Sequence, residues 1–222
     1  MYFLSTRDKN EKITAAQAII KGLSSDRGLF VPSEFKNLKS ELKNLVNLDY
    51  KELAYVILKE FLTDYSEKEL KYCINSAYDE KFDTEKIAPI SKVGDDYVLE
   101  LYHGPTCAFK DMALTIMPYL LKTAIEKNNL KEEVVILTAT SGDTGKAALE
   151  GFKDVDKIKI VVFFPENGVS NIQKLQMKTT GGDNTCVVGI NGNFDDAQTG
   201  VKNIFADNNF NKDLKEKGYI LS

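Results

Sequence analysis

The residue types best suited to chemistry on a small anionic substrate gather in the segment TATSGDTGKAAL, residues 138–149. This segment follows an apolar, β-branched run and opens a helical pattern, so it predicts a strand-to-helix turn at the edge of a sheet. Free amides in the first turn of a helix, together with its positive dipole end, hold carboxylates and phosphates. We therefore predict an anion site, with an ordinary capped turn as the alternative. Its residues are Ser141, Gly142, Asp143 and Thr144.

A lysine that could act as a nucleophile lies in the segment HGPTCAFKDMAL, residues 103–114. Lys110 stands near the start of a predicted helix, where the helix dipole disfavours a cation. With the apolar neighbours Ala108 and Phe109, this position favours the uncharged amine, which is the form that attacks a carbonyl group. Lys110 is therefore a candidate Schiff-base lysine, and the alternative is an exposed lysine beside Asp111.

Three further residues have both a functional and a structural interpretation. His103 is either a catalytic acid or base or a turn histidine that hydrogen-bonds the backbone. Asn193, in INGNFDDAQ, either binds a ligand or caps a helix whose first turn would hold Asp195 and Asp196. Lys174, in VSNIQKLQM, is either a cation for an anionic ligand or part of a solvated helix face.

The elements that must position these residues fall into two parts. Only two of the 14 glycines precede Pro89, and this shift in glycine usage predicts a domain boundary there. A chain of 222 residues with 43% hydrophobic residues is long enough for one or two domains with a sizeable core. We therefore expect domains at 1–88 and 89–222.

The N-terminal part is predicted to be mostly helical. Leu53, Ile57 and Phe61 recur at a helical interval. A second helical pattern over residues 70–77 follows a capping box formed by Ser66 and Glu69. The expected exceptions are a short strand at residues 2–5 and an irregular loop at residues 26–32.

The part from Pro89 onward predicts an α/β fold. A hairpin around Gly94 comes first, followed by a helix from about Lys110 that is kinked at Pro118. Continuous apolar runs then alternate with helical stretches, which is typical of a parallel sheet covered on both faces. The expected strands lie at 134–138, 158–164, 185–190 and 219–222. Because no helical pattern follows the last strand, we expect the fold to be truncated there.

The composition excludes several classes of protein. The longest apolar run has six residues, far below the roughly 20 that span a bilayer, and no signal sequence is evident, which predicts a cytoplasmic protein. Two arginines in a chain of net charge −4 argue against nucleic-acid binding. Three dispersed cysteines and a single histidine predict neither a disulfide framework nor a metal site. The loop at 141–146 matches neither nucleotide-binding glycine pattern.

Four segments, in this order, resemble threonine synthase: HGPTCAFKDMAL, TATSGDTGKAAL, FFPENGVSNIQKLQM and NGNFDDAQ. The opening FLSTRDKNEKITAAQAIIKGLSSDRGLFVP is similar to the N-terminal region of the same family. The resemblance implies a pyridoxal-phosphate enzyme of fold type II that converts O-phospho-L-homoserine and water to L-threonine and phosphate. Family members are considerably longer, so it also implies that these 222 residues are a fragment with little or no activity.

The resemblance assigns roles to individual residues. Lys110 matches the lysine that holds the cofactor and then shuttles protons, and residues 141–144 match the loop that receives the substrate carboxylate. Related enzymes carry asparagine, which contacts the cofactor, where this chain has Asp143. Asn193 matches a residue that some members use on the substrate phosphate. Either Lys174 or Lys202 is a candidate for the cation that an arginine supplies in those members.

Three other readings stay open at this point. Another fold type II enzyme, such as a dehydratase or a cysteine synthase, would share the lysine and the anion loop. A phospholyase could act on the same phosphorylated substrate without making threonine. A non-catalytic anion-binding module could retain only the fold, and either an oligomer or a monomer is compatible with the sequence.

Overall fold

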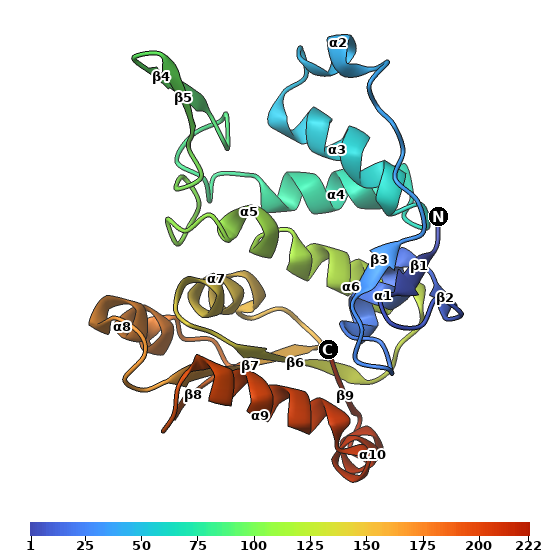
Figure 1. Ribbon diagram of the computed structural model, residues 1–222, viewed down its shortest axis with the longest axis vertical. Helices are drawn as coiled ribbons and strands as arrows, with labels where there is room; N and C mark the ends of the chain where they lie inside the picture. The colour runs from blue at the N-terminus through green and yellow to red at the C-terminus, as the bar shows by residue number, and fades with distance from the viewer. The chain divides into compact units, whose positions relative to one another are not determined.

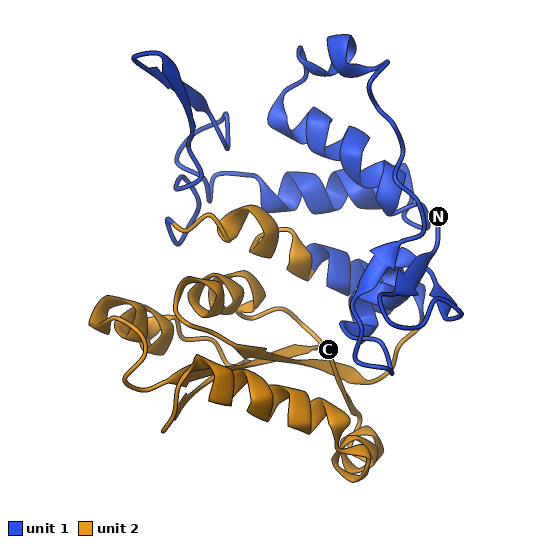
Figure 2. Cartoon of the chain, viewed as in Figure 1, with its two compact units in different colours: residues 1–107, 119–128 blue, residues 108–118, 129–222 orange.

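The chain divides into two compact units, which Figure 2 colours separately. A computed structural model describes all of residues 1–222. The predicted boundary at Pro89 lies inside unit 1, so the compact units do not follow the shift in glycine usage. The domains 1–88 and 89–222 therefore stay a prediction. Unit 1 comprises Met1–Cys107 and Tyr119–Asn128, and unit 2 comprises Ala108–Pro118 and Asn129–Ser222.

Unit 1 contains a three-stranded antiparallel sheet in the order β2-β1-β3. The short strand predicted at residues 2–5 is confirmed as β1. The irregular loop predicted at residues 26–32 is wrong at its end, because β3 pairs there with β1, with Phe30 opposite Ser5. Pro32 ends this edge strand, where a missing N–H is tolerated. The strands are β1 (Phe3–Ser5), β2 (Lys12–Ile13) and β3 (Phe30–Pro32).

Helices are the main regular element of the N-terminal region, but they hold 34 of residues 1–88, so this part is less helical than predicted. The capping box of Ser66 and Glu69 is confirmed, and it starts a helix that buries Leu70 and Ile74. Asp49 caps the preceding helix in the same way. Both helices therefore begin where side-chain oxygens accept hydrogen bonds from otherwise unpaired amides. The helices are α1 (Ala15–Lys21), α2 (Leu42–Leu45), α3 (Tyr50–Phe61) and α4 (Glu67–Ala77).

The hairpin predicted around Gly94 is confirmed. β4 (Ile90–Val93) pairs with β5 (Asp96–Leu99) in antiparallel register, with Val93 opposite Asp96. Gly94 adopts φ +63° in the connecting turn, a conformation that glycine takes at low cost. Both strands are exposed along most of their length, and in Figure 1 the hairpin extends away from the helices of unit 1.

The single kinked helix predicted from about Lys110 is wrong, because the structure has two helices there. α5 (Asp111–Leu114) ends before α6 (Met117–Lys127) begins. Pro118 lies in the first turn of α6, where its missing N–H leaves no intrahelical bond unmade. At the end of α5, the carbonyl of Leu114 lies close to the backbone of Gly151. A Cβ added to Gly151 would stand 2.2 Å from this carbonyl oxygen.

Unit 2 is built on a four-stranded parallel sheet in the order β8-β7-β6-β9, as the sequence predicts. Alternate residues of the central strand β7 are almost completely buried, namely Ile158, Ile160, Val162 and Phe164. The strands are β6 (Glu133–Ala139), β7 (Ile158–Pro165), β8 (Thr185–Ile190) and β9 (Tyr219–Leu221).

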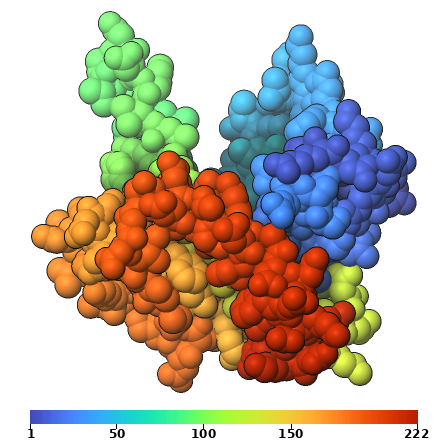
Figure 3. All heavy atoms as spheres, turned by 60° about the horizontal axis from the view of Figure 1, so that its bottom comes forward, coloured from blue at the N-terminus to red at the C-terminus, as the bar shows by residue number.

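Helices cover both faces of this sheet. α7 (Asp143–Phe152) packs on β7 from one face, and α9 (Phe194–Ala206) packs on β6 and β7 from the other (Figure 1). α10 (Asn208–Glu216) lies beside α9 on the surface of unit 2, as Figure 3 shows in red. α8 (Asn171–Thr179) packs against α7. No helix of the chain is both long enough and apolar enough to cross a membrane.

Candidate active site

The candidate residues of unit 2 are arranged by the carboxyl ends of its parallel strands. β6, β7 and β8 each lead through a short loop into the first turn of a helix, α7, α8 and α9 respectively. Because the strands are parallel, these three loops lie at the same edge of the sheet, where ligands bind in open α/β folds. The loops and helix starts carry Ser141, Gly142, Asp143, Thr144, Lys174 and Asn193.

Thr140, which the sequence analysis did not single out, holds the first of these loops in place. Its side chain is buried, and its Oγ1 accepts hydrogen bonds from the amides of Gly142 and Gly145, both at 2.9 Å. The same hydroxyl donates to the carbonyl of Gly142 at 3.1 Å. A threonine directly after an apolar strand and two residues before a glycine is the signal that could have identified this role.

Gly142 stands at the N-cap of α7 with φ +147° and ψ −93°, a conformation open only to glycine. Gly142 has no side chain to cap the helix, and Thr140 Oγ1 serves instead as the acceptor for the first-turn amide of Gly145. The amides of Ser141, Asp143 and Thr144 donate to no protein atom. The predicted strand-to-helix turn is therefore confirmed, and it leaves amides free at a helix N-terminus. Anion binding there stays a prediction.

The carboxylate of Asp143 is tied to the next helix. Gln173 Nε2 donates to Asp143 Oδ1 at 2.9 Å, and Gln173 Oε1 accepts from the amide of Ser170 at 3.1 Å. Ser170 Oγ accepts from the amide of Gln173 at 3.2 Å, which completes a capping box on α8. The first turns of α7 and α8 are thus joined through one glutamine side chain.

Lys110 occupies the N-cap position of α5, which packs against α7. Its side chain is half-buried, and Nζ lies 4.7 Å from the centroid of the Phe109 ring. Lys110 forms no ion pair, and the adjacent Asp111 is buried with 1% of its surface exposed. The structure differs from the predicted alternative, an exposed lysine beside Asp111, in that Lys110 is half-buried. The expected helix-dipole effect is small, because α5 has only four residues.

Lys174 and Asn193 both have partners within the protein. Lys174 Nζ forms a close ion pair with Glu166, and this hydrogen bond lowers the pKa of Glu166. Asn193 Oδ1 accepts from the amide of Asp196 at 3.1 Å, and the amide of Asn193 donates back to Asp196 Oδ2 at 2.8 Å. The capping role of Asn193 is confirmed. Its Nδ2 donates to no protein atom and could still reach a ligand.

His103 lies in unit 1, and its partners differ from both interpretations of the sequence. Nδ1 lies 2.5 Å from Asp83 Oδ1, and Nε2 lies 2.7 Å from Glu100 Oε2. These hydrogen bonds, that from Glu100 first, raise the pKa of His103. An imidazole that is hydrogen-bonded through both nitrogens has no nitrogen free to act as a base. The two bonds instead connect the segment around Asp83 to the end of the hairpin.

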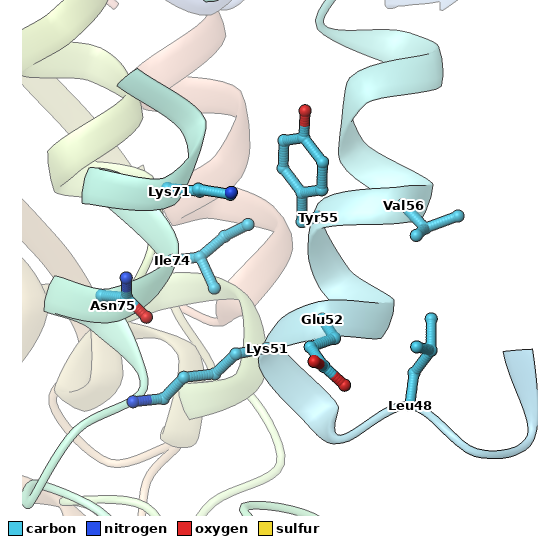
Figure 4. A pocket seen from close by; sticks show the side chains of 8 residues that line it. All are labelled: Leu48, Lys51, Glu52, Tyr55, Val56, Lys71, Ile74 and Asn75. Carbon is cyan, nitrogen blue, oxygen red and sulfur yellow. The ribbon is translucent and has the colours of Figure 1, made fainter. Parts of the chain in front are cut away.

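A separate hollow of about 270 Å³ lies between α3 and α4 in unit 1 (Figure 4). One of its two lysines, Lys71, pairs with Glu67 at 2.6 Å and lies 5.4 Å from the centroid of the Tyr55 ring. None of the candidate site residues predicted from the sequence lines it. The lining residues are Leu48, Lys51, Glu52, Tyr55, Val56, Lys71, Ile74 and Asn75.

Comparison with known proteins confirms the resemblance stated from the sequence. Residues 2–78 match a family model described as the threonine synthase N terminus. The threonine synthase of Pseudomonas aeruginosa is 40% identical over 215 residues, which is 96% of this chain and 45% of that protein. Human threonine synthase-like 1 is 42% identical in an alignment 239 positions long, which covers 99% of this chain and 32% of that protein.

Solved structures agree with the sequence comparison. The PLP-bound threonine synthase from Brucella melitensis superposes with a TM-score of 0.85 at 33% identity, covering 100% of this chain and 47% of that one. The threonine synthase from Escherichia coli gives a TM-score of 0.84 at 33% identity and covers 100% and 49%. The predicted α/β fold is thus confirmed. The chain spans less than half the length of each of these relatives.

Proposed function

The chain corresponds in sequence and fold to the N-terminal portion of threonine synthases, and we propose that it is the lysine-bearing part of such an enzyme. The proposed activity is that of a pyridoxal-phosphate-dependent lyase of fold type II, acting on O-phospho-L-homoserine and water to give L-threonine and phosphate. The observation that carries this proposal is the superposition of the whole chain on a PLP-bound threonine synthase with a TM-score of 0.85.

The residues of unit 2 fit the cofactor and the substrate. Lys110 has no carboxylate partner, so its amine is available to a carbonyl group. The free amides of Ser141, Asp143 and Thr144 suit a carboxylate, because they present donors at the positive end of α7. When bound, pyridoxal phosphate supplies an electron sink that eases loss of protons from the substrate carbons.

Each residue has one task in the proposed mechanism. Lys110 would hold the cofactor through its amine and then move protons at the α and β carbons of the substrate. The loop at 141–144 would bind and orient the substrate carboxylate. Asn193, through its free Nδ2, and Lys174 would bind the substrate phosphate. Lys174 is paired with Glu166, so the phosphate has to compete with that carboxylate.

Titration with pyridoxal phosphate, followed by borohydride reduction and peptide mapping, tests the proposal. We expect a visible absorbance band and reduced label concentrated on Lys110. K146A is a suitable control, because Lys146 Nζ is already engaged at 3.0 Å with both Glu150 and Thr180. Label spread over exposed lysines, with none enriched at Lys110, would contradict the proposed role of this chain.

Two further expectations belong to the same proposal. More than half of the length of each relative has no counterpart in these 222 residues, so we expect the chain alone to bind cofactor weakly and to produce little or no threonine. The phospholyase left open by the sequence, which would consume the same substrate without making threonine, stays the alternative activity. Identification of the amino-acid or keto-acid product separates the two activities.

A further inference from the structure

The side chain of Gln173 makes two hydrogen bonds that fix how its amide is turned. Its Oε1 accepts from the amide of Ser170 at 3.1 Å, and its Nε2 donates to Asp143 Oδ1 at 2.9 Å. The Ser170 amide can only donate and the Asp143 carboxylate can only accept. Rotating the amide by 180° would therefore lose both bonds, so the orientation follows from the chemistry of the two partners.

Helix capping alone does not explain why a glutamine stands at this position. A capping box needs a side-chain acceptor at the third helical residue, and glutamate supplies one as well as glutamine does. Glutamine alone can also donate, and here the donor is used on Asp143. The Gln173 side chain thus also donates a hydrogen bond to the Asp143 carboxylate, and a glutamate at this position would repel that carboxylate.

The backbone of the first loop leaves room for this contact. A Cβ added to Gly142 would stand 2.3 Å from Gln173 Nε2 and 2.8 Å from Oε1, so any larger residue would displace the amide. Gly142 also has φ +147°, which an L-residue rarely adopts. Two independent features, the absent side chain and the paired amide, therefore serve the same contact.

We propose that Gln173 is a positioning residue, which holds the Asp143 carboxylate through Oδ1 and leaves Oδ2 for a hydrogen-bond donor on the bound cofactor or substrate. This inference rests on the proposed function, since it takes Asp143 to face the bound cofactor. Asp143 Oδ2 accepts from no protein atom, and the Asp143 side chain is exposed. Gln173 itself touches neither ligand in this scheme and acts only through Asp143.

The variant Q173E separates the two tasks of the side chain. It keeps the acceptor that caps α8 but places a carboxylate oxygen against the Asp143 carboxylate. We expect affinity for pyridoxal phosphate to fall about 10-fold and the absorbance band of the Lys110 complex to shift. The double variant D143N/Q173E restores a donor–acceptor pair with its direction reversed and leaves the side-chain oxygen at position 143 as the acceptor for the ligand. Its affinity should therefore return to within about threefold of the wild type. Q176E makes the same charge change on α8 and should leave affinity and spectrum unaltered.

The outcomes distinguish this inference from the proposed function. Wild-type labelling of Lys110 together with an unaltered Q173E would overturn the role of Gln173 alone. A weakened Q173E that D143N does not rescue would also overturn it, because the defect would then come from the cap or the fold. Urea midpoints of all variants, measured without cofactor, identify a folding defect. Absence of Lys110 labelling in the wild type would overturn the proposed function and this role with it.

Discussion

Replacing Thr140 by valine should loosen the loop that carries the candidate anion site. Valine keeps the shape of the side chain, including the methyl group that packs near Gly145, but it removes the hydroxyl. Two amides that now donate to Oγ1 at 2.9 Å, those of Gly142 and Gly145, would lose their acceptor. Because Thr140 is 1% exposed, water cannot replace that acceptor without opening the loop.

The expected cost of T140V follows from these bonds. Each buried donor left unpaired costs about 1–3 kcal/mol, and loss of a helix cap costs about 1 kcal/mol. Since the loop can relax in part, we expect the free energy of unfolding to fall by about 2–4 kcal/mol in urea titrations. Amide hydrogen exchange at Gly145 should also accelerate. T144V is the matched control, because the hydroxyl of Thr144 has no protein partner, and it should stay within about 0.5 kcal/mol of the wild type. Equal stability of T140V and T144V would refute this account of the loop.

Three other perturbations test separate parts of the structure. G151A should lower the free energy of unfolding by about 1–3 kcal/mol in urea titrations, because the new Cβ would stand 2.2 Å from a backbone carbonyl of α5. The control is G200A in α9, whose Cβ meets nothing within 4 Å, and it should raise the free energy of unfolding by about 0.5–1 kcal/mol. Hydrogen bonds to two carboxylates, Glu100 first, raise the pKa of His103, so its contribution to the stability of unit 1 should be complete below about pH 6 and lost as the pH rises through the folded-state pKa. Urea titrations of wild type and H103Q at pH 6 and pH 9 measure this contribution of His103 to the free energy of unfolding. If that free energy changed equally with pH in both proteins, His103 would not be its source. K110A should abolish cofactor labelling at this position. It should change the free energy of unfolding by less than about 1 kcal/mol, because the side chain of Lys110 contacts a neighbouring aromatic ring. A larger loss of stability would show that Lys110 has a structural role.

Local sequence patterns were sufficient to predict the elements whose structure depends on residues close together in the chain. The capping box at Ser66, the hairpin turn at Gly94 and the apolar strands of the parallel sheet all depend on short segments, and each was predicted correctly. The loop at 141–144 belongs to the same group, since a strand, a glycine and a helix follow one another directly.

Other features depend on residues far apart in the chain, and these could not be predicted from local patterns. Phe30–Pro32 forms a strand only because β1 lies beside it. α5 and α6 are separate helices, with Pro118 in the first turn of α6. The carbonyl at the end of α5 meets Gly151 from another helix. The link between Gln173 and Asp143 spans 30 residues and depends on how α7 and α8 pack.

The candidate site is held by side chains that bond to backbone amides, which has a consequence for ligand binding. Thr140, Ser170 and Asn193 each fix the start of a helix at the carboxyl edge of the sheet. A loop that is already ordered loses little conformational entropy when an anion binds, so more of the interaction energy contributes to affinity. Only hydrogen-bonding groups without a protein partner, such as the amides of Ser141, Asp143 and Thr144 and Asn193 Nδ2, remain for a ligand. The same bonds that stabilise the fold therefore also select which groups are available for recognition.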